Sequence, residues 1–274
     1  MPFPVRVPWP APLVEGRLLG RRNRFLADIE LPGGRVATAH CVNTGRMEAL
    51  VIRGARAWVS HHPGGGRALE WTWRMVEEDG VLVGCDTSMP NRIVAACIEA
   101  RAVPGLAAWR AFRAEARYGE RSRVDFLLEE RGGRPHFVEV KNCHLAYPDG
   151  RGYFPDSVSE RATGHLRELA REAAAGARAT VLFTAQRADI RAIRPSDLHD
   201  PAFAGAAREA AAAGVRFRAI SCAPTLGGIE VRGTLPVELK PYRLERHRRW
   251  FEERRATSGW SRRAEPFPLL DAAP

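Results

Sequence analysis

Three charged residues fall inside a run of sequence that otherwise has the pattern of a β-hairpin, and this run limits how the chain can fold. Residues 123–128, RVDFLL, alternate and predict a strand that carries Asp125. A charged, Gly-rich turn separates it from residues 136–142, HFVEVKN, which predict a second strand. Alternate residues of a strand share a face, so Glu139 and Lys141 point the same way. Burying such charges is costly unless they pair with one another or hold a metal ion.

The lysine in this hairpin is unusual for the chain. Of 42 Lys and Arg residues, only Lys141 and Lys240 are lysines. An ammonium and a guanidinium are not interchangeable as point charges or proton donors. Two interpretations follow, a half-buried Glu–Lys pair or a divalent-metal site for phosphodiester hydrolysis. In the second, Asp125 and Glu139 hold Mg²⁺ or Mn²⁺, and Lys141 steadies the attacking water or the charge that develops on phosphorus.

Length and charge favour two domains and a polyanionic partner. A chain of 274 residues has room for a large core, and its net charge of +10 suits nucleic acid, although a general bias toward Arg would have the same effect. The five cysteines are scattered and predict reduced thiols. No apolar run approaches the length of a membrane span, and the Pro-rich start lacks the layout of a signal peptide, so we expect a cytoplasmic protein with no membrane partner.

Residues 1–87 predict a small closed β-barrel. Short β-like runs alternate with Gly- and Pro-rich turns up to about residue 86, a spacing typical of a five-stranded oligonucleotide-binding (OB) barrel. Several polar residues of this domain are candidates for contact with nucleic acid. They are Arg21, Arg22 and Arg24 at the first turn, and Asn43 and Arg46 in the loop NTGRM.

Residues 88–240 predict a three-layer α/β domain with a mixed sheet. A helix begins near Ser88, the acidic hairpin follows, and residues 144–156 are expected to form a loop. Helices over 157–175 and 196–213 then alternate with strands. Residues 241–274 form a basic extension with a solvated helix and a loose end.

Several stretches in order resemble the sugar fermentation stimulation protein A family, over roughly residues 13–240. They are RFLADIELPGG, HCVNTGRM, TSMPNRIV, YGERSRVDFLL, VEVKN, GYFPDSVSERATGHLREL and LPVEL. The resemblance implies an N-terminal OB-type barrel followed by a domain similar to the PD-(D/E)XK nucleases. It also implies DNA binding and a possible role in regulating sugar metabolism.

The nuclease resemblance assigns roles to the hairpin. It makes Asp125 and Glu139 metal ligands, with the carbonyl of Val140 as a third, and it makes Lys141 the catalytic amine. Glu115 matches an acidic position just before the hairpin. In the helix that follows, Arg161 and His165 lie one turn apart and are expected to face the scissile phosphate.

The chain departs from the family pattern in places that bear on the metal and the substrate. The first helix of the domain has Ala95 and Ala96 where the family tends to carry a glutamate, and Glu99 is an alternative acid on a nearby face. Thr163-Gly164 stands where the family has Gln-Lys. Val42 replaces a usual proline, and Cys85-Asp86 replaces Val-Asn.

Three functions remain open from these residues. The first is a metal-dependent nuclease acting on nucleic acid, DNA in preference to RNA. The second is an inactive DNA-binding regulator that uses the nuclease fold as a platform. The third is a small-molecule or protein-binding module whose positive charge is only compositional.

Overall fold

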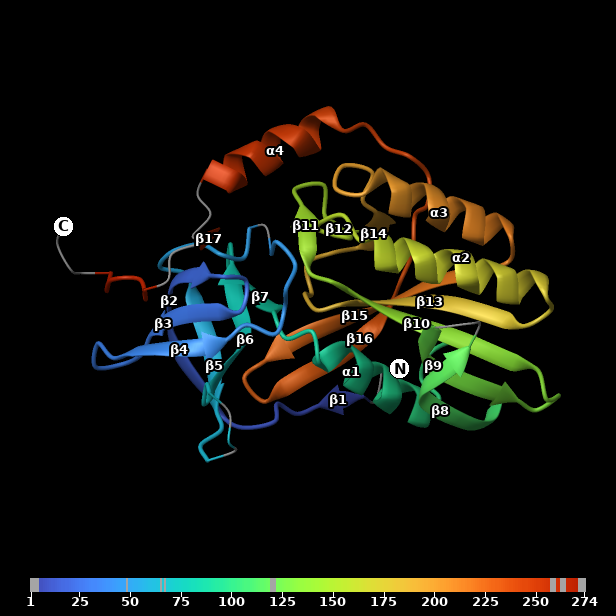
Figure 1. Ribbon diagram of the computed structural model, residues 1–274, viewed down its shortest axis with the longest axis horizontal. Coiled ribbons are helices and arrows are strands. Elements are labelled where there is room, and N and C mark those ends of the chain that lie inside the picture. Colours follow the sequence, from blue (N-terminus) through green and yellow to red (C-terminus); the bar gives the residue numbers. More distant parts are fainter. Residues whose placement is uncertain are drawn as a thin grey trace.

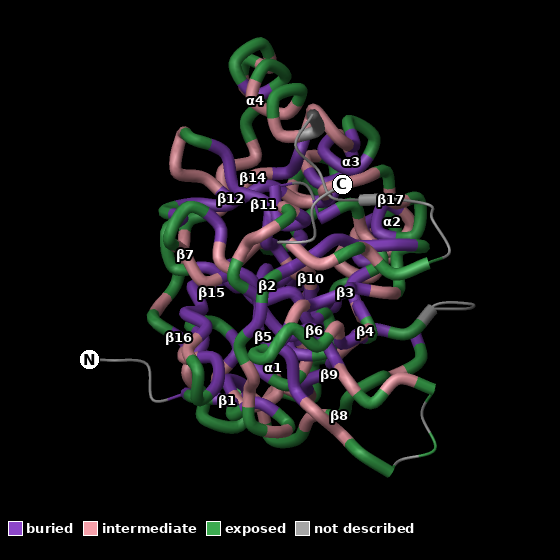
Figure 2. The backbone as a smooth tube through the Cα atoms, turned by 90° about the vertical axis from the view of Figure 1, so that its left-hand side faces the viewer, coloured by how far each residue is buried: buried purple, intermediate pink, exposed green. Residues whose placement is uncertain are grey.

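The computed structural model places a β-barrel beside an α/β domain, with the C-terminal extension reaching from the second to the first (Figure 1). It describes residues 5–47, 49–64, 66, 68–118, 122–256, 260–261 and 265–270. Buried residues gather in the interior of the molecule and exposed residues at its periphery (Figure 2). Within the described residues, no helix combines the length and the apolar character needed to cross a membrane.

The barrel contains five strands that close on themselves. They are β2 (Leu13–Arg22), β3 (Leu26–Glu30), β4 (Val36–His40), β5 (Arg56–His61) and β6 (Trp71–Glu78), and β7 (Val81–Gly84) pairs with β6. The order is β2-β3-β4-β6-β5, and β5 returns to β2. Strand β2 pairs with β5 through its first half and with β3 through its second, with a bulge between Leu18 and Gly20. The expected OB-type barrel is confirmed.

The second domain is built on a seven-stranded mixed sheet of order β1-β16-β15-β13-β10-β9-β8. Its central strands β10 (Pro135–Cys143), β13 (Arg178–Ala185) and β15 (Arg216–Thr225) are parallel. Strands β8 (Trp109–Tyr118), β9 (Ser122–Glu130), β16 (Gly228–Leu235) and β1 (Arg6–Val7) are antiparallel to their neighbours. The hairpin read from the sequence is β9–β10.

Helices cover both faces of this sheet. Helix α1 (Met89–Glu99) packs on one face, and α2 (Glu160–Ala174) and α3 (Pro201–Ala212) lie on the other (Figure 1). Each face has its own apolar core. The result is the three-layer α/β domain with a mixed sheet that was expected. The boundary near residue 87 stays a prediction, and β1 at the start of the chain is hydrogen-bonded to β16 of the second sheet.

Two predictions of local structure in this domain were wrong. The expected loop over 144–156 contains β11 (Leu145–Tyr147) and β12 (Arg151–Phe154), which form a small sheet with β14 (Ala192–Pro195). Helix α3 begins at Pro201 and not at Ser196, because Asp200 is the N-cap and accepts a hydrogen bond from the Phe203 N–H at 2.9 Å. Its expected C-terminal glycine is confirmed, since Gly214 has φ +100°.

Described parts of the extension contact both units. Helix α4 (Glu245–Ala256) docks on the small sheet, where Trp250 packs edge-on against Tyr147 and His247 hydrogen-bonds the Tyr153 hydroxyl at 3.0 Å. Beyond it, β17 (Trp260–Ser261) pairs in parallel with β2 of the barrel. Part of the end expected to be loose, residues 260–261, therefore contacts the barrel, and residues 257–259, 262–264 and 271–274 lie outside the described residues.

Residues 265–270 continue along the outer surface of the barrel. The Phe267 ring lies over Gly20, where a Cβ atom would be 2.4 Å from the ring. Arg53 donates hydrogen bonds to the carbonyls of Pro268 and Leu269, at 2.8 and 3.0 Å. Glycine at position 20 is needed for this close approach.

We expect Phe267→Ala to lower the free energy of unfolding by about 1–2 kcal/mol, because the ring is half-buried. Urea unfolding followed by tryptophan fluorescence measures the change. Leu226→Ala is the control, since Leu226 is 63% exposed and its truncation should change stability by less than about 0.5 kcal/mol. Equal effects of the two substitutions would mean that the tail does not stabilise the barrel.

Candidate nuclease site

Strands β9 and β10 separate at Asp125, and this separation opens the site. Their pairing runs from Glu129–Pro135 to Phe126–Val138 and ends there. At the next position the Asp125 carboxylate accepts the Val140 N–H at 2.7 Å, so a side chain takes the place of a backbone carbonyl. The other Asp125 oxygen accepts a hydrogen bond from Asn91 Nδ2 of α1 at 2.9 Å.

The strand also twists at this point. Val124 and Phe126 are two residues apart and would share a face of a flat strand, yet Val124 packs in the core beside α2 and Phe126 in the core beside α1. Glu115 lies opposite on β8, between the pairs Ala114–Phe126 and Ala116–Val124, and has φ +51°. A non-glycine residue with a positive φ carries backbone strain of a kind found at functional sites.

Glu139 is the most buried charged residue of the site. Its side chain is 3% exposed, and its Oε1 accepts a hydrogen bond from Lys141 Nζ at 2.7 Å and another from His165 Nδ1 of α2. Burial raises the pKa of this carboxyl, but His165 and Lys141 outweigh burial and hold it below its usual range. Burial, followed by the charge of Glu139, raises the pKa of Asp125. Glu139 therefore stays ionised, whereas the ionised form of Asp125 beside it is disfavoured.

These residues line an open pocket of about 630 Å³, which we call the acidic pocket. Its other walls come from β8, β9 and α2, and its lining consists of Glu115, Arg123, Asp125, Glu139, Arg161, Gly164, His165 and Glu168. A second pocket of about 320 Å³ shares Asp125, Glu139, Arg161 and His165 and extends toward Lys141. Arg123 and Arg161 are exposed, and no ion pair engages either one in the part of the chain that the structure describes.

The residues of the acidic pocket fit a divalent cation. Glu139 Oε2 is buried and has no hydrogen-bond partner among the described residues, which leaves a carboxylate oxygen free to bind a cation. Two carboxylates and a backbone carbonyl suit ions such as Mg²⁺ and Mn²⁺, which prefer oxygen ligands. Across the described ranges, no three His, Cys, Asp or Glu side chains converge on a single ion position. Water would therefore complete the coordination, as is usual for Mg²⁺.

The two further acids named in the sequence analysis, Glu115 and Glu99, differ in their position relative to the acidic pocket. Glu115 lines the acidic pocket. Glu99, the alternative acid on a nearby face, is exposed in the last turn of α1 and lines neither pocket. The residue that α1 directs at Asp125 is Asn91, an amide in its first turn.

Two of the arginines proposed for nucleic-acid contact are internal, which corrects that prediction. The fully buried Arg21 guanidinium donates to four carbonyls of adjoining loops, those of Arg24, Asn43, Gly45 and Arg46. Arg22 is 7% exposed and pairs with Asp28 at 2.9 Å. Both side chains shape the barrel because they satisfy buried carbonyls or a buried carboxylate. Arg24 and Arg46 are exposed and remain candidates for phosphate contact.

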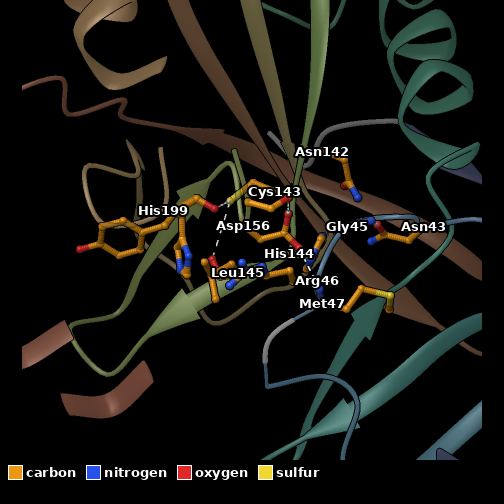
Figure 3. A network of polar contacts seen from close by, with 12 residues as sticks. Asn43, Gly45, Arg46, Met47, Asn142, Cys143, His144, Leu145, Asp156 and His199 are labelled. Atoms are coloured by element: carbon orange, nitrogen blue, oxygen red, sulfur yellow. Dashed lines mark hydrogen bonds and ion pairs between the residues drawn. The ribbon is translucent and has the colours of Figure 1, made fainter. Parts of the chain in front are cut away.

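The loop 43–47 joins the barrel to the second domain. Figure 3 shows this loop beside Asp156 and His144. Asn43 is buried, and its Oδ1 accepts the Gly45 N–H at 2.8 Å, so its amide holds the loop together. The Met47 N–H donates to Asp156 at 2.9 Å, and His144 Nε2 lies 3.3 Å from the same oxygen.

Three residues of these sites were missed by sequence reasoning, namely Asn91, Asp156 and Glu168. Glu168 could have been found from its spacing, since it lies three residues after His165 on the same face of α2. Asn91 lies in the quoted stretch TSMPNRIV, but its contact with Asp125 spans 34 residues. Asp156 bonds a loop 109 residues away, which no local pattern indicates.

Comparison with known proteins matches both units to one family. Residues 19–85 match the domain described as "SfsA N-terminal OB domain", and residues 88–228 match "Sugar fermentation stimulation protein RE domain". The sugar fermentation stimulation protein homolog of Thioalkalivibrio sulfidiphilus is 43% identical over 228 residues, which cover 83% of this chain and 96% of that protein. The homolog of Rhodospirillum centenum is 43% identical and covers 83% of this chain and 97% of its own.

A solved structure has the same architecture. Pyrococcus furiosus SfsA in complex with Ca²⁺ superposes with a TM-score of 0.77 at 30% sequence identity. The match covers 87% of this chain and 99% of that chain.

Proposed function

This chain belongs to the sugar fermentation stimulation protein family, and we propose that it binds nucleic acid, DNA in preference to RNA, and cleaves phosphodiester bonds with a divalent metal ion at the acidic pocket. The observation that carries the proposal is that Glu139, which lines the acidic pocket with Asp125, has a buried Oε2 without a hydrogen-bond partner among the described residues. The complex of the Pyrococcus furiosus relative with Ca²⁺ supports a divalent ion. Members of the family are described as DNA-binding, and this supports DNA as the nucleic acid that is bound.

The residues of the hairpin and His165 each have a role in the proposed reaction. Asp125 and Glu139, with the carbonyl of Val140 that the nuclease resemblance assigns, would hold the ion, which would supply Lewis-acid stabilisation of charge on the phosphoryl oxygens. Lys141 lies 2.7 Å from Glu139 Oε1 and orients the attacking water or offsets the developing charge. His165 fixes the same oxygen, so that Oε2 is the one left for the ion.

Two arginines that line the acidic pocket are assigned to binding the substrate. Arg123 on β9 and Arg161 on α2 line the pocket with exposed guanidinium groups. Phosphates on each side of the scissile bond would pair with them, because a guanidinium binds phosphate through two parallel hydrogen bonds. Arg24 and Arg46 on the barrel would extend the contact along the strand.

We expect Arg161→Ala to weaken DNA binding at every sequence tested and to reduce the slope of log affinity against log salt by about one, since one phosphate contact is lost. Fluorescence anisotropy with a labelled duplex, at several salt concentrations and without divalent metal, measures both. Arg232→Ala is the matched control, because Arg232 is an exposed arginine already paired with Glu230 at 2.7 Å. Wild-type binding that does not change with salt would contradict the proposal.

A catalytically inactive DNA-binding regulator is the second candidate. The observation that favours it is the absence of an acid at positions 95 and 96 of α1, where Ala95 and Ala96 pack against the core. The deciding experiment incubates the protein with single- and double-stranded DNA and RNA in Mg²⁺, in Mn²⁺ and in EDTA. Metal-dependent cleavage supports the nuclease. Binding without cleavage in any metal supports the regulator and overturns the nuclease.

A further inference from the structure

We propose that the outer surface of the barrel over β2 and β3 is a docking site for extended peptides, and that residues 265–270, which we call the tail, occupy it within the same chain. The site fits a segment of another protein in which an aromatic residue is followed by proline and leucine, as in Phe267-Pro268-Leu269. Such a segment binds by displacing the tail. We call this surface the tail site, and the residues that form it are Gly20, Asp28, Glu30 and Arg53.

A charged side chain is buried on the outside of the barrel, under the tail. Ala27 and Ile29 of β3 pack in the barrel core, so Asp28 between them points outward. Asp28 is nevertheless fully buried. Its Oδ2 accepts a hydrogen bond from Arg22 Nε at 2.9 Å and another from the Phe267 N–H of the tail at 3.1 Å. This carboxylate therefore recognises a backbone N–H group of a segment that lies over β3.

Side chains of both charge signs bind the backbone of the tail. The Leu270 N–H donates to Glu30 Oε2 at 3.5 Å. Arg53 Nη2 donates to the carbonyls of Pro268 and Leu269, at 2.8 and 3.0 Å. Carboxylates thus accept backbone N–H groups, and a guanidinium binds backbone carbonyls. A nucleic-acid backbone has no N–H donor, and its phosphates would be repelled by these carboxylates, so the tail site favours a polypeptide.

A strand edge and a flat platform complete the tail site. The pairing of β2 with β5 ends at Arg17, and β17 pairs in parallel with β2 further along, at residues 21–22 (Figure 1). Addition of an extended segment to a strand edge is a recurrent mode of peptide recognition, in which contacts with individual side chains give specificity. Here the specific contact is aromatic, because the Phe267 ring occupies the space that a Cβ atom of Gly20 would need.

The tail site and the tail come from different parts of the chain. All four residues of the site lie within 19–85, the range that matches the N-terminal OB domain of the family. Residues 265–270 lie outside both matched ranges. An open groove of about 720 Å³ continues the surface from Leu270 along β2 and the turn after β3. The family domain therefore builds the site, and the segment that fills it comes from outside that domain.

Binding of a labelled peptide tests the proposal. A fluorescein-labelled peptide with the sequence of residues 265–270 is titrated with full-length protein and followed by anisotropy. Phe267→Ala should bind the peptide about 5–30-fold more tightly than the wild type, because the competing tail loses its ring contact. The same peptide carrying Phe267→Ala tests the ring contact without altering the protein, and it should not bind.

A second substitution in the Phe267→Ala protein locates the peptide. Adding Gly20→Ala should abolish the gain, since the new methyl group would lie 2.4 Å from the ring, and the φ of Gly20 is one that alanine can adopt. Adding Gly205→Ala is the matched control and should keep the gain, because a Cβ atom there would meet no heavy atom within 4 Å.

Three results would overturn the proposal. The first is that Phe267→Ala binds no peptide, or binds it equally well with Gly20→Ala. The second is that Phe267→Ala gains affinity for a single-stranded oligonucleotide and not for the peptide, which would make the surface a nucleic-acid site. The third is a wild-type dimer in light scattering that Phe267→Ala converts to a monomer, which would make the occupant the tail of a second copy.

Discussion

Replacing Asp125 with asparagine is expected to lower metal-dependent DNA cleavage by at least about 100-fold, because the pocket loses one of its two assigned metal-binding carboxylates. The fold should be kept. Asparagine can still accept the Val140 N–H, and the Asn91 amide can turn to present its oxygen to the new NH₂ group. Initial rates on the substrate preferred by the wild type measure the effect, and anisotropy in EDTA should show unchanged binding.

The same substitution should not destabilise the metal-free protein. Burial and the charge of Glu139 raise the pKa of Asp125 above its usual range, so the ionised form is disfavoured in the folded state at neutral pH. A neutral amide removes that cost, and the melting temperature in EDTA should equal or exceed that of the wild type. Glu129→Gln, in an exposed ion pair on the same strand, is the control. If Asp125→Asn cleaves DNA at the wild-type rate, the assignment of Asp125 as a metal ligand is refuted.

Replacing Asp156 with alanine is expected to lower the free energy of unfolding by about 3 kcal/mol, because the Met47 N–H and His144 lose their shared acceptor at the junction between barrel and second domain. For a chain of this size the loss corresponds to a fall in melting temperature on the order of 6–10 °C. Scanning calorimetry at neutral pH measures it. Glu230→Ala, in a more exposed pair with Arg232, should cost less than about 1 kcal/mol.

The difference in free energy of unfolding between the wild type and Asp156→Ala should decrease as the pH falls. Although burial raises the pKa of Asp156, His144 and the Met47 N–H outweigh burial and hold it below its usual range. The stabilisation is therefore fully present above the unfolded pKa of ~4 and is lost as pH falls through the folded value. The two proteins should differ equally at pH 7 and 5 and converge below about pH 4. A constant difference down to pH 3 would contradict the role of the charge.

The acidic hairpin could be predicted because its information is local. Alternation places Glu139 and Lys141 on one face, and the 2.7 Å bond between them agrees with that reading. The position of Asp125 on the neighbouring strand follows from a short turn between two β-like runs. The helix spacing of Arg161 and His165 is also local, and both residues line the acidic pocket.

Burial could not be predicted in the same way. Arg21, Arg22 and Arg24 look alike in the sequence as a basic cluster, but the first two are internal and the third is exposed. Whether an arginine faces solvent depends on which carbonyls and carboxylates the rest of the chain brings to it. For Arg21 these are carbonyls of residues 43–46, and for Arg22 the partner is Asp28.

The sequence by itself determined the two-domain architecture, the hairpin and its three charges, because each follows from periodicity or spacing over a few residues. Only the tertiary structure decided which charges meet. It brought Asn91 of α1 to Asp125 and Glu168 of α2 to the wall of the same pocket. It also laid Phe267 on Gly20. These contacts join segments far apart in the chain, and their energies come from burial and pairing, which exist only once the layers have packed.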